Sequence, residues 1–147
     1  MERTLKDILV ADTSGLVSLV VPTDHNHASA VTAAEHLRAK HADILVPSAV
    51  FYEYLNILGR KVGHAVATGT ASAFTPPFIL LNDSSPQILD LAFAKFRDAS
   101  QAVSFTDCLV MATADECQTM QIFGFDKQFA DAGYTRLTPS QDWSKFE

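Results

Sequence analysis

Four acidic side chains stand at positions where an α/β protein could hold a metal ion. The first, Asp12, directly follows the apolar run of residues 8–11, which is typical of a strand buried on both faces. Open α/β sheets place their ligand crevice at the C-terminal ends of such strands. Asp126 follows a later apolar run in the same way, while Asp107 and Glu53 each fall near the start of an expected helix. Carboxylate oxygens are the ligands that Mg²⁺ prefers, so the four acids are candidates for one site.

Three of these acids also have a purely structural interpretation. Asp12 and Asp126 both precede expected helices, where aspartate commonly serves as an N-cap or a turn residue. Ser104 followed by Asp107 resembles a capping box with Asp in place of Glu, and the helix dipole favours a carboxylate there. The sequence alone leaves both interpretations open for each residue.

The fourth acid, Glu53, lies one turn into its helix between Tyr52 and Tyr54. An exposed surface glutamate is the commonest interpretation of such a position. The flanking aromatic residues instead favour partial burial, and a partly buried glutamate needs a partner. Glu53 shares its helix face with Asn56 and Arg60.

The elements that position these acids alternate between short apolar strands and helices. This alternation predicts an α/β fold, a three-layer α/β/α sandwich with a central parallel sheet of about four to five strands. The expected strands are residues 8–11, 44–46, 78–81 and 121–123, with residues 134–137 as the candidate fifth.

Helix boundaries are indicated by capping residues. Ser48 is expected to cap a helix over residues 49–63, and Ser85, followed by Pro86, is a strong helix start. A helix over residues 104–118 is apolar all round and should be buried. The side chains expected on the buried side of the helix after Ser85 are Ile88, Leu89, Ala92, Phe93 and Phe96.

Length and composition describe one globular domain over residues 1–147. Hydrophobic residues make up 48% of the chain and charged residues 19%, which argues against disorder. No apolar run reaches the ~20 residues that span a bilayer, and the N-terminus has no secretory pattern. Cys108 and Cys117 fit neither a disulfide framework nor a zinc site. These features predict a cytoplasmic protein with reduced thiols and no membrane partner.

The net charge of −6 comes from 17 acidic residues against 11 lysines and arginines. That balance is awkward for a protein that binds nucleic acid by bulk electrostatics. If four acids share one metal site, 13 acids remain against 11 basic residues, and the objection weakens.

Other candidate motifs carry less weight. Asp24, His25 and His27 resemble a transition-metal cluster, but we expect Asp24 to cap a helix whose first turns carry exposed histidines. The chain contains neither G-x-x-x-x-G-K-[ST] nor G-x-G-x-x-G, so phosphate-loop and dinucleotide-binding functions lack support.

Four short motifs occur in an order that resembles a known family. They are D-T-S-G-L at residues 12–16, P-S-A-V-F-Y-E at 47–53, T-D-C-L-V-M-A-T-A at 106–114 and F-D-K-Q-F at 125–129. Together they resemble the motifs of PIN-domain nucleases, and most closely those of the VapC-like toxins of toxin–antitoxin pairs. The resemblance covers nearly the whole chain.

This resemblance implies a metal-dependent ribonuclease that uses Mg²⁺ or Mn²⁺. The acidic quartet would be Asp12, Glu53, Asp107 and Asp126, with the Ser14 hydroxyl supporting the site. We assign Asp12 and Asp107 as principal ligands, and Glu53 and Asp126 as outer or second-metal ligands, one of which could orient the attacking water. Carboxylate-held metal ions acidify water and neutralise phosphate charge, in sites with one ion or with two ions ~3.5–4 Å apart.

The resemblance also implies partners. These are an RNA substrate, a small antitoxin protein and a second copy of the chain in a homodimer. The antitoxin would occupy an apolar groove near residues 51–58 and block the metal site. One departure from the family is Gly124, where relatives more often carry Thr or Ser. A supporting hydrogen bond near Asp126 is therefore in doubt.

Rival functions remain open. In a haloacid-dehalogenase-like phosphatase Asp12 would be the nucleophile, but such enzymes carry a second Asp where this chain has Ser14. A non-enzymatic binding module would use the acids only as caps, and a housekeeping RNA-processing nuclease would share the site without being a toxin. The basic groups that would select an RNA cannot be placed from the sequence: Arg60, Lys61, Arg97 and Lys127.

Overall fold

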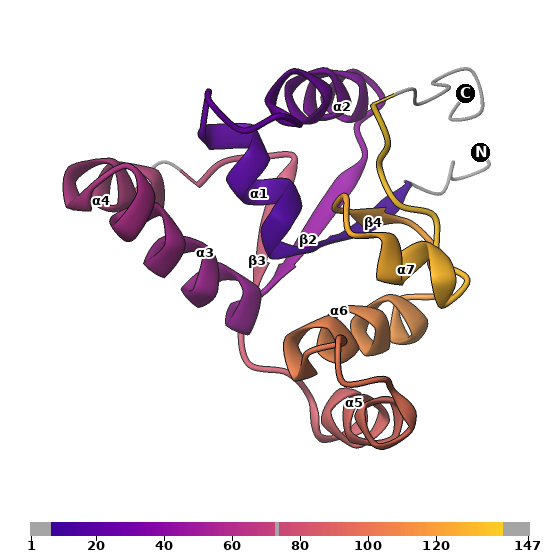
Figure 1. Ribbon diagram of the computed structural model, residues 1–147. Coiled ribbons are helices and arrows are strands. Elements are labelled where there is room, and N and C mark those ends of the chain that lie inside the picture. The colour runs from indigo at the N-terminus through magenta and orange to yellow at the C-terminus, as the bar shows by residue number, and fades with distance from the viewer. Residues whose placement is uncertain (1–6, 73, 140–147) are drawn as a thin grey trace.

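The computed structural model describes residues 7–72 and 74–139 (Figure 1). Its strands form one parallel sheet in the order β3-β2-β1-β4. Their bounds are β1 Ile8–Ala11, β2 Asp43–Pro47, β3 Phe78–Leu81 and β4 Ile122–Phe123. The predicted parallel sheet is therefore confirmed, with four strands in the described residues.

Residues 134–137 do not form the candidate fifth strand. Among them, Thr135 makes only an isolated parallel bridge to Gln121. The segment follows β4, and its Leu137 N–H donates to the Gly124 carbonyl at 2.9 Å. Because β4 itself is two residues long, there is too little edge for a further ladder.

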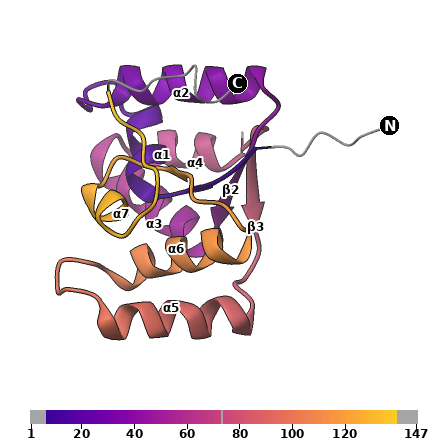
Figure 2. The same ribbon diagram turned by 90° about the vertical axis from the view of Figure 1, so that its right-hand side faces the viewer.

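Seven helices cover the sheet in the described part of the chain. They are α1 Thr13–Val20, α2 His27–Ala39, α3 Ser48–Lys61, α4 His64–Ser72, α5 Pro86–Asp98, α6 Phe105–Glu116 and α7 Lys127–Asp131. Figures 1 and 2 show α1 and α2 on one side of the sheet and α6, with α5 beyond it, on the other. This arrangement confirms the three-layer α/β/α sandwich. None of these helices is long and apolar enough to span a bilayer.

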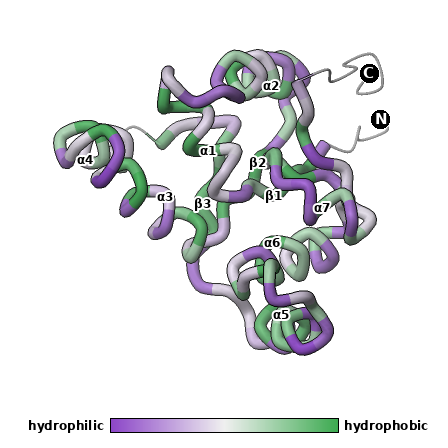
Figure 3. The backbone as a smooth tube through the Cα atoms, in the orientation of Figure 1, coloured by the Kyte–Doolittle hydropathy of each residue, from purple (hydrophilic) through white to green (hydrophobic). Residues whose placement is uncertain are grey.

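The core lies on both faces of the sheet, against α1, α2 and α3 as well as against α6. Leu9, Val10 and Ala11 of β1 are each at most 1% exposed, and α6 is buried continuously from Asp107 to Ala114. Figure 3 shows hydrophobic residues along β1, β2 and β3. The prediction of a helix buried all round is thus confirmed for α6, which places its first turn against the edge where the strands end.

Two of the three predicted serine caps are confirmed. The Ser85 hydroxyl accepts from the Ile88 N–H at 3.2 Å, and Ser104 caps α6. Ser48 was expected to cap α3, and this is wrong: Pro47 holds the N-cap position and Ser48 is the first helical residue. The reason is that β2 continues through Pro47 directly into α3, which leaves no loop residue to serve as a cap.

The prediction that Phe93 and Phe96 are buried is also wrong. Phe93 is 55% exposed and Phe96 47% exposed, while Ala92 is fully buried. Figure 2 shows α5 as the outermost helix, packed on α6 and away from the sheet. An outermost helix buries only a narrow stripe, so both rings lie at its border and contact Phe105 at centroid distances of 4.9 and 5.6 Å.

Candidate metal centre

The pairing of β1 with β4 brings two of the predicted acids together. Ala11 is in register with Phe123, and the Asp12 N–H donates to the Phe123 carbonyl at 3.0 Å. Asp126 follows β4 by three residues, and the first turn of α6 presents Asp107 at the same edge. One carboxylate oxygen from each of these three aspartates lies within 4.8 Å of the other two.

Two glycines permit this close approach. A Cβ at Gly15 would lie 2.2 Å from the carbonyl oxygen of Phe123, so no other residue fits there without movement of the backbone. A Cβ at Gly124 would lie 2.8 Å from the Asp12 Cβ and 3.3 Å from the Ser14 Oγ. Gly124 is therefore the contact point between the β4 end and the Asp12 side chain.

A hydroxyl from another element lies beside Gly124, the position where relatives more often carry Thr or Ser. The Ser14 hydroxyl donates to Asp12 Oδ2 at 2.8 Å and accepts from the Phe125 N–H at 3.2 Å. A hydroxyl from α1 thus fills the space beside Gly124 and ties the β4 end to Asp12. Ser14 thereby bonds the backbone N–H of Phe125, the residue before Asp126.

Asp12 is both a helix cap and a member of the acid cluster. Its Oδ2 accepts from the Ser14 N–H at 3.3 Å, which caps α1, and the residue is only 2% exposed. Burial, together with the negative charges of Asp126 and Asp107, raises the pKa of Asp12 to about 7, against the opposing effect of the Ser14 hydrogen bonds. The metal-ligand and capping interpretations are therefore not exclusive.

Asp107 is likewise both a capping residue and a member of the acid cluster. It forms the predicted capping box, in which its Oδ2 accepts from the Ser104 N–H at 2.9 Å and its own N–H donates to the Ser104 hydroxyl at 3.1 Å. The same Oδ2 accepts from Gln128 Nε2 at 2.5 Å. Asp107 is 8% exposed, so these bonds fix a largely buried carboxylate in orientation.

Gln128 was missed by the sequence analysis. It lies in α7, two residues after Asp126, and is half-buried. The sequence indicated a role for Gln128 only by its position, a polar side chain in the first turn of the helix that follows β4 and Asp126. That signal does not say which carboxylate the amide will reach, because α6 and α7 meet only through the tertiary fold.

Asp126 is the exposed member of the cluster. It holds the N-cap position of α7 but makes no side-chain capping bond, so the cap interpretation has no hydrogen bond to support it. Burial of its carboxylate and the charge of Asp107 raise the pKa of Asp126, while a hydrogen bond with Asp12 and the charge of Arg136 oppose the rise.

Glu53 does not join the three aspartates. The expected partial burial is wrong: Glu53 is exposed, as is Tyr52, whereas Tyr54 is only 3% exposed. The helical period turns Tyr54 into the core and leaves its two predecessors outside. Glu53 nevertheless lines the cleft that contains the aspartates.

This cleft has a volume of about 370 Å³ and lies between α1, α3 and the start of α6. The aspartate cluster forms one part of it. The other part is formed by the turn between α1 and α2 and by the C-terminal half of α3, with Asp24, His25, Asn26, Ile57 and Lys61 among the lining residues.

Asp24 does not cap a helix, contrary to expectation. α2 begins at His27 with Asn26 in the N-cap position, and Asp24 lies two residues before Asn26 in the turn. Its Oδ1 accepts from the Ser18 hydroxyl and the Asn26 N–H, both at 2.9 Å. His25 is exposed as expected, but His27 is half-buried, with Nδ1 2.8 Å from the Ser18 carbonyl.

The donor chemistry of the aspartate cluster fits a hard divalent cation. In the described residues, Asp12, Asp107 and Asp126 are the group whose ligand atoms lie close enough to hold one ion, and all offer carboxylate oxygen. Mg²⁺ and Mn²⁺ prefer such oxygen ligands, whereas sites without histidine or cysteine suit zinc poorly.

Comparison with known proteins agrees with this architecture. The sequence matches the PIN domain family over residues 9–133. The fold is similar to the crystal structure of VapC20 from Mycobacterium tuberculosis, described as a sarcin-ricin loop cleaving toxin, with a TM-score of 0.73. The two chains are 20% identical, and the similarity covers 88% of this chain and 97% of VapC20. No curated protein matches the sequence.

The raised pKa of Asp12 predicts how stability depends on pH. Because the native state binds this proton more tightly than the unfolded chain, the free energy of unfolding of the metal-free protein should fall as pH rises from about 4 through about 7. Asp12→Asn should remove on the order of 4 kcal/mol of this fall. Urea denaturation in EDTA across this range measures it.

Asp90→Asn is the matched control, since Asp90 is exposed on α5. It should leave the pH dependence as in the wild type. A pH dependence equally steep in Asp12→Asn and the wild type would contradict the assignment to Asp12.

Proposed function

This chain belongs to the PIN domain family, and on that premise we propose that it is a metal-dependent endoribonuclease that hydrolyses RNA phosphodiester bonds. The observation that carries the proposal is the convergence of Asp12, Asp107 and Asp126 within 4.8 Å at one end of an open cleft. We further propose that the protein is the toxin of a toxin–antitoxin pair and acts in the cytoplasm as a single domain.

The three aspartates would hold Mg²⁺ or Mn²⁺, which would acidify a water molecule and neutralise charge on the phosphate. Two of the carboxylates are fixed in advance: Ser14 holds Oδ2 of Asp12, and Gln128 with Ser104 holds Oδ2 of Asp107. Such hydrogen bonds orient ligands before an ion binds. The proposed roles of Asp126 and Glu53, which both line the cleft, are those of outer or second-metal ligands, and one of them would orient the attacking water.

The rival functions fit less well. A phosphatase would need Asp12 as an accessible nucleophile, but Asp12 is 2% exposed and its Oδ2 is bonded to Ser14. A binding module with capping acids leaves Asp126 without a role, because its side chain caps nothing. A housekeeping nuclease would share the whole site, and only the partner separates it from a toxin.

The catalytic proposal predicts the behaviour of Asp126→Asn. The wild type should cleave single-stranded or looped RNA with Mn²⁺ or Mg²⁺ and stop in excess EDTA, since such RNA can enter a narrow cleft. Asp126→Asn should lower the rate on the order of 100-fold. The control is Asp131→Asn, an exposed aspartate at the other end of α7, which should cleave as the wild type does.

Thermal melts of the same proteins test metal binding separately. Added Mn²⁺ should raise the Tm of the wild type and of Asp131→Asn by more than that of Asp126→Asn, which lacks one proposed outer ligand. Asp126 is the cleaner choice for this test than Asp107, whose replacement also removes bonds to Ser104 and Gln128. Cleavage that survives EDTA, or an equal Tm increase in all three proteins, would contradict the proposal.

A groove between α3 and α4 is the proposed antitoxin site. Its volume is about 620 Å³, and it adjoins the segment where an apolar groove was expected. The lining residues are Leu55, Asn56, Gly59 and Arg60 of α3 and His64, Ala67, Thr68 and Ala71 of α4. The mixture of small, apolar and basic side chains suits an amphipathic segment of a small acidic partner.

Ala71→Arg should therefore abolish co-purification with the product of a small reading frame beside the gene. The arginine would fill the groove, whereas RNA cleavage by the isolated protein should not change. Ala94→Arg, at an exposed position of α5, is the control that should still co-purify. Retention of the partner by Ala71→Arg would exclude this groove as its site.

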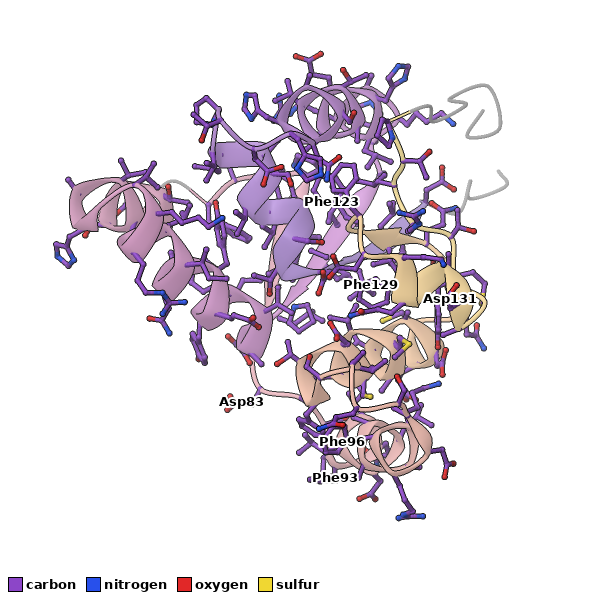
Figure 4. The ribbon with its side chains drawn as sticks, viewed as in Figure 1. Asp83, Phe93, Phe96, Phe123, Phe129 and Asp131 are labelled. Carbon is purple, nitrogen blue, oxygen red and sulfur yellow. The ribbon has the colours of Figure 1, made fainter. Side chains whose placement is uncertain are left out.

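We also propose a homodimer formed through α5. Phe93 and Phe96, labelled in Figure 4, leave about half of each ring exposed on this outermost helix. Exposed aromatic side chains of this kind mark protein contacts.

The double substitution Phe93→Asp with Phe96→Asp should halve the molecular mass measured by light scattering. About half of each side chain is already exposed, so the substitutions should not prevent folding. Gln87→Asp, at an exposed position on the opposite face of the same helix, should leave the dimer intact. A monomeric wild type would refute the dimer.

A further inference from the structure

An RNA strand that enters the cleft meets mainly negative charge. Acidic side chains dominate its lining: Asp12, Asp24, Glu53, Asp107 and Asp126. Among the described residues that line it, Lys61 is the one lysine or arginine, and His25 adds a ring N–H. Because phosphate contacts supply most of the affinity of proteins for nucleic acid, these two residues mark where phosphate can bind.

Lys61 lies on the same stripe of α3 as Glu53. Glu53, Ile57 and Lys61 are spaced four residues apart, which places them along one face of the helix, and all three line the cleft. The helical rise separates Glu53 from Lys61 by about 12 Å along the axis. Lys61 therefore lies beyond Glu53 along α3, and Ile57 offers an apolar surface between them.

The turn between α1 and α2 faces this end of the stripe. Burial alone would raise the pKa of Asp24, but hydrogen bonds from Asn26 and Ser18 and the nearby charges of His25 and Lys61 hold it below its ordinary value. Asp24 is therefore an anion, held by Ser18 and Asn26, beside Lys61 and His25 at this end of the cleft.

The other basic groups named in the sequence analysis lie elsewhere. Arg60 lines the groove between α3 and α4, and Lys127 lines a separate pocket beside α5. Arg97 is exposed on α5 and lines neither the cleft nor the groove. Lys61 differs from its neighbour Arg60 in facing the cleft.

We propose that Lys61 and His25 bind the RNA phosphate adjacent to the scissile one, so that the strand runs along α3 from the aspartates towards the α1–α2 turn. Asp24 is the positioning residue of this subsite, and Ile57 contacts the intervening sugar or base. The inference rests on the proposed ribonuclease function and extends it to the path of the substrate.

The test compares steady-state cleavage of one single-stranded RNA oligonucleotide in Mn²⁺ by Lys61→Gln and Arg60→Gln. Both changes remove one exposed charge from the last turn of α3, so their effects on folding are matched. Lys61→Gln should raise KM about tenfold, the loss expected for one charge-assisted contact, with kcat within about twofold. Arg60→Gln should match the wild type.

The salt dependence of KM and the KM values of two further variants test the phosphate contact directly. The slope of log KM against log salt concentration should fall by about 0.7 in Lys61→Gln, as expected for one lost phosphate contact on a single strand. Lys61→Arg should restore KM, and His25→Ala should raise it about threefold.

Equal KM values for Lys61→Gln and Arg60→Gln, or a loss confined to kcat, would overturn the inference while the ribonuclease proposal stands. A wild type that cleaves no RNA would instead refute the proposed function itself. Thermal melts of both variants confirm that the compared proteins are folded.

Discussion

The pairing of β1 with β4 is the constraint on which the rest of the site depends. This two-residue ladder sets Asp12 beside the chain that leads to Asp126, and it does so at the edge where the strands end. The approach is close enough that Gly15 and Gly124 are required: a Cβ at Gly15 would meet the backbone, and one at Gly124 would meet the Asp12 Cβ. The pairing register of β4 against β1 is therefore critical, because a shift by one residue would turn every side chain of the strand to the other face.

Like charges are held together here because each buried carboxylate has a second, structural function. Asp12 caps α1 through Ser14, and Asp107 completes the capping box of α6 with Ser104. In both residues the bonded oxygen is Oδ2, so the bonds that stabilise the helix ends also fix the carboxylates in orientation. Burial, with a further contribution from the charges of Asp126 and Asp107, raises the pKa of Asp12, so the ionised cluster is unfavourable without a cation. Capping and metal binding are therefore complementary uses of the same side chains.

Features set by local pattern could be predicted from the sequence, and features set by tertiary approach could not. Apolar runs located all four strands, and the rule that parallel strands end at one edge predicts that Asp12 and Asp126 lie at the same edge of the sheet. The exposure of Phe93 depends on α5 being an outermost helix, which its own amphipathic pattern does not reveal. Similarly, Gln128 reaches Asp107 only because α7 packs beside α6. Whether residues 1–147 form one domain stays a prediction.

The site divides into a fixed part and a part that belongs to α3. The aspartate cluster is built from the ends of β1 and β4 and the start of α6, and none of its three members comes from α3. Glu53 and Lys61 face the cleft from α3, while Arg60 on the same helix faces the groove shared with α4. A helix moves as a rigid element, so a ligand that shifts α3 from the groove side must move Glu53 and Lys61 relative to the aspartates. Occupation of the groove can therefore alter the substrate path without contact with the metal ligands, provided that the ligand binds the two positions of α3 with different affinity.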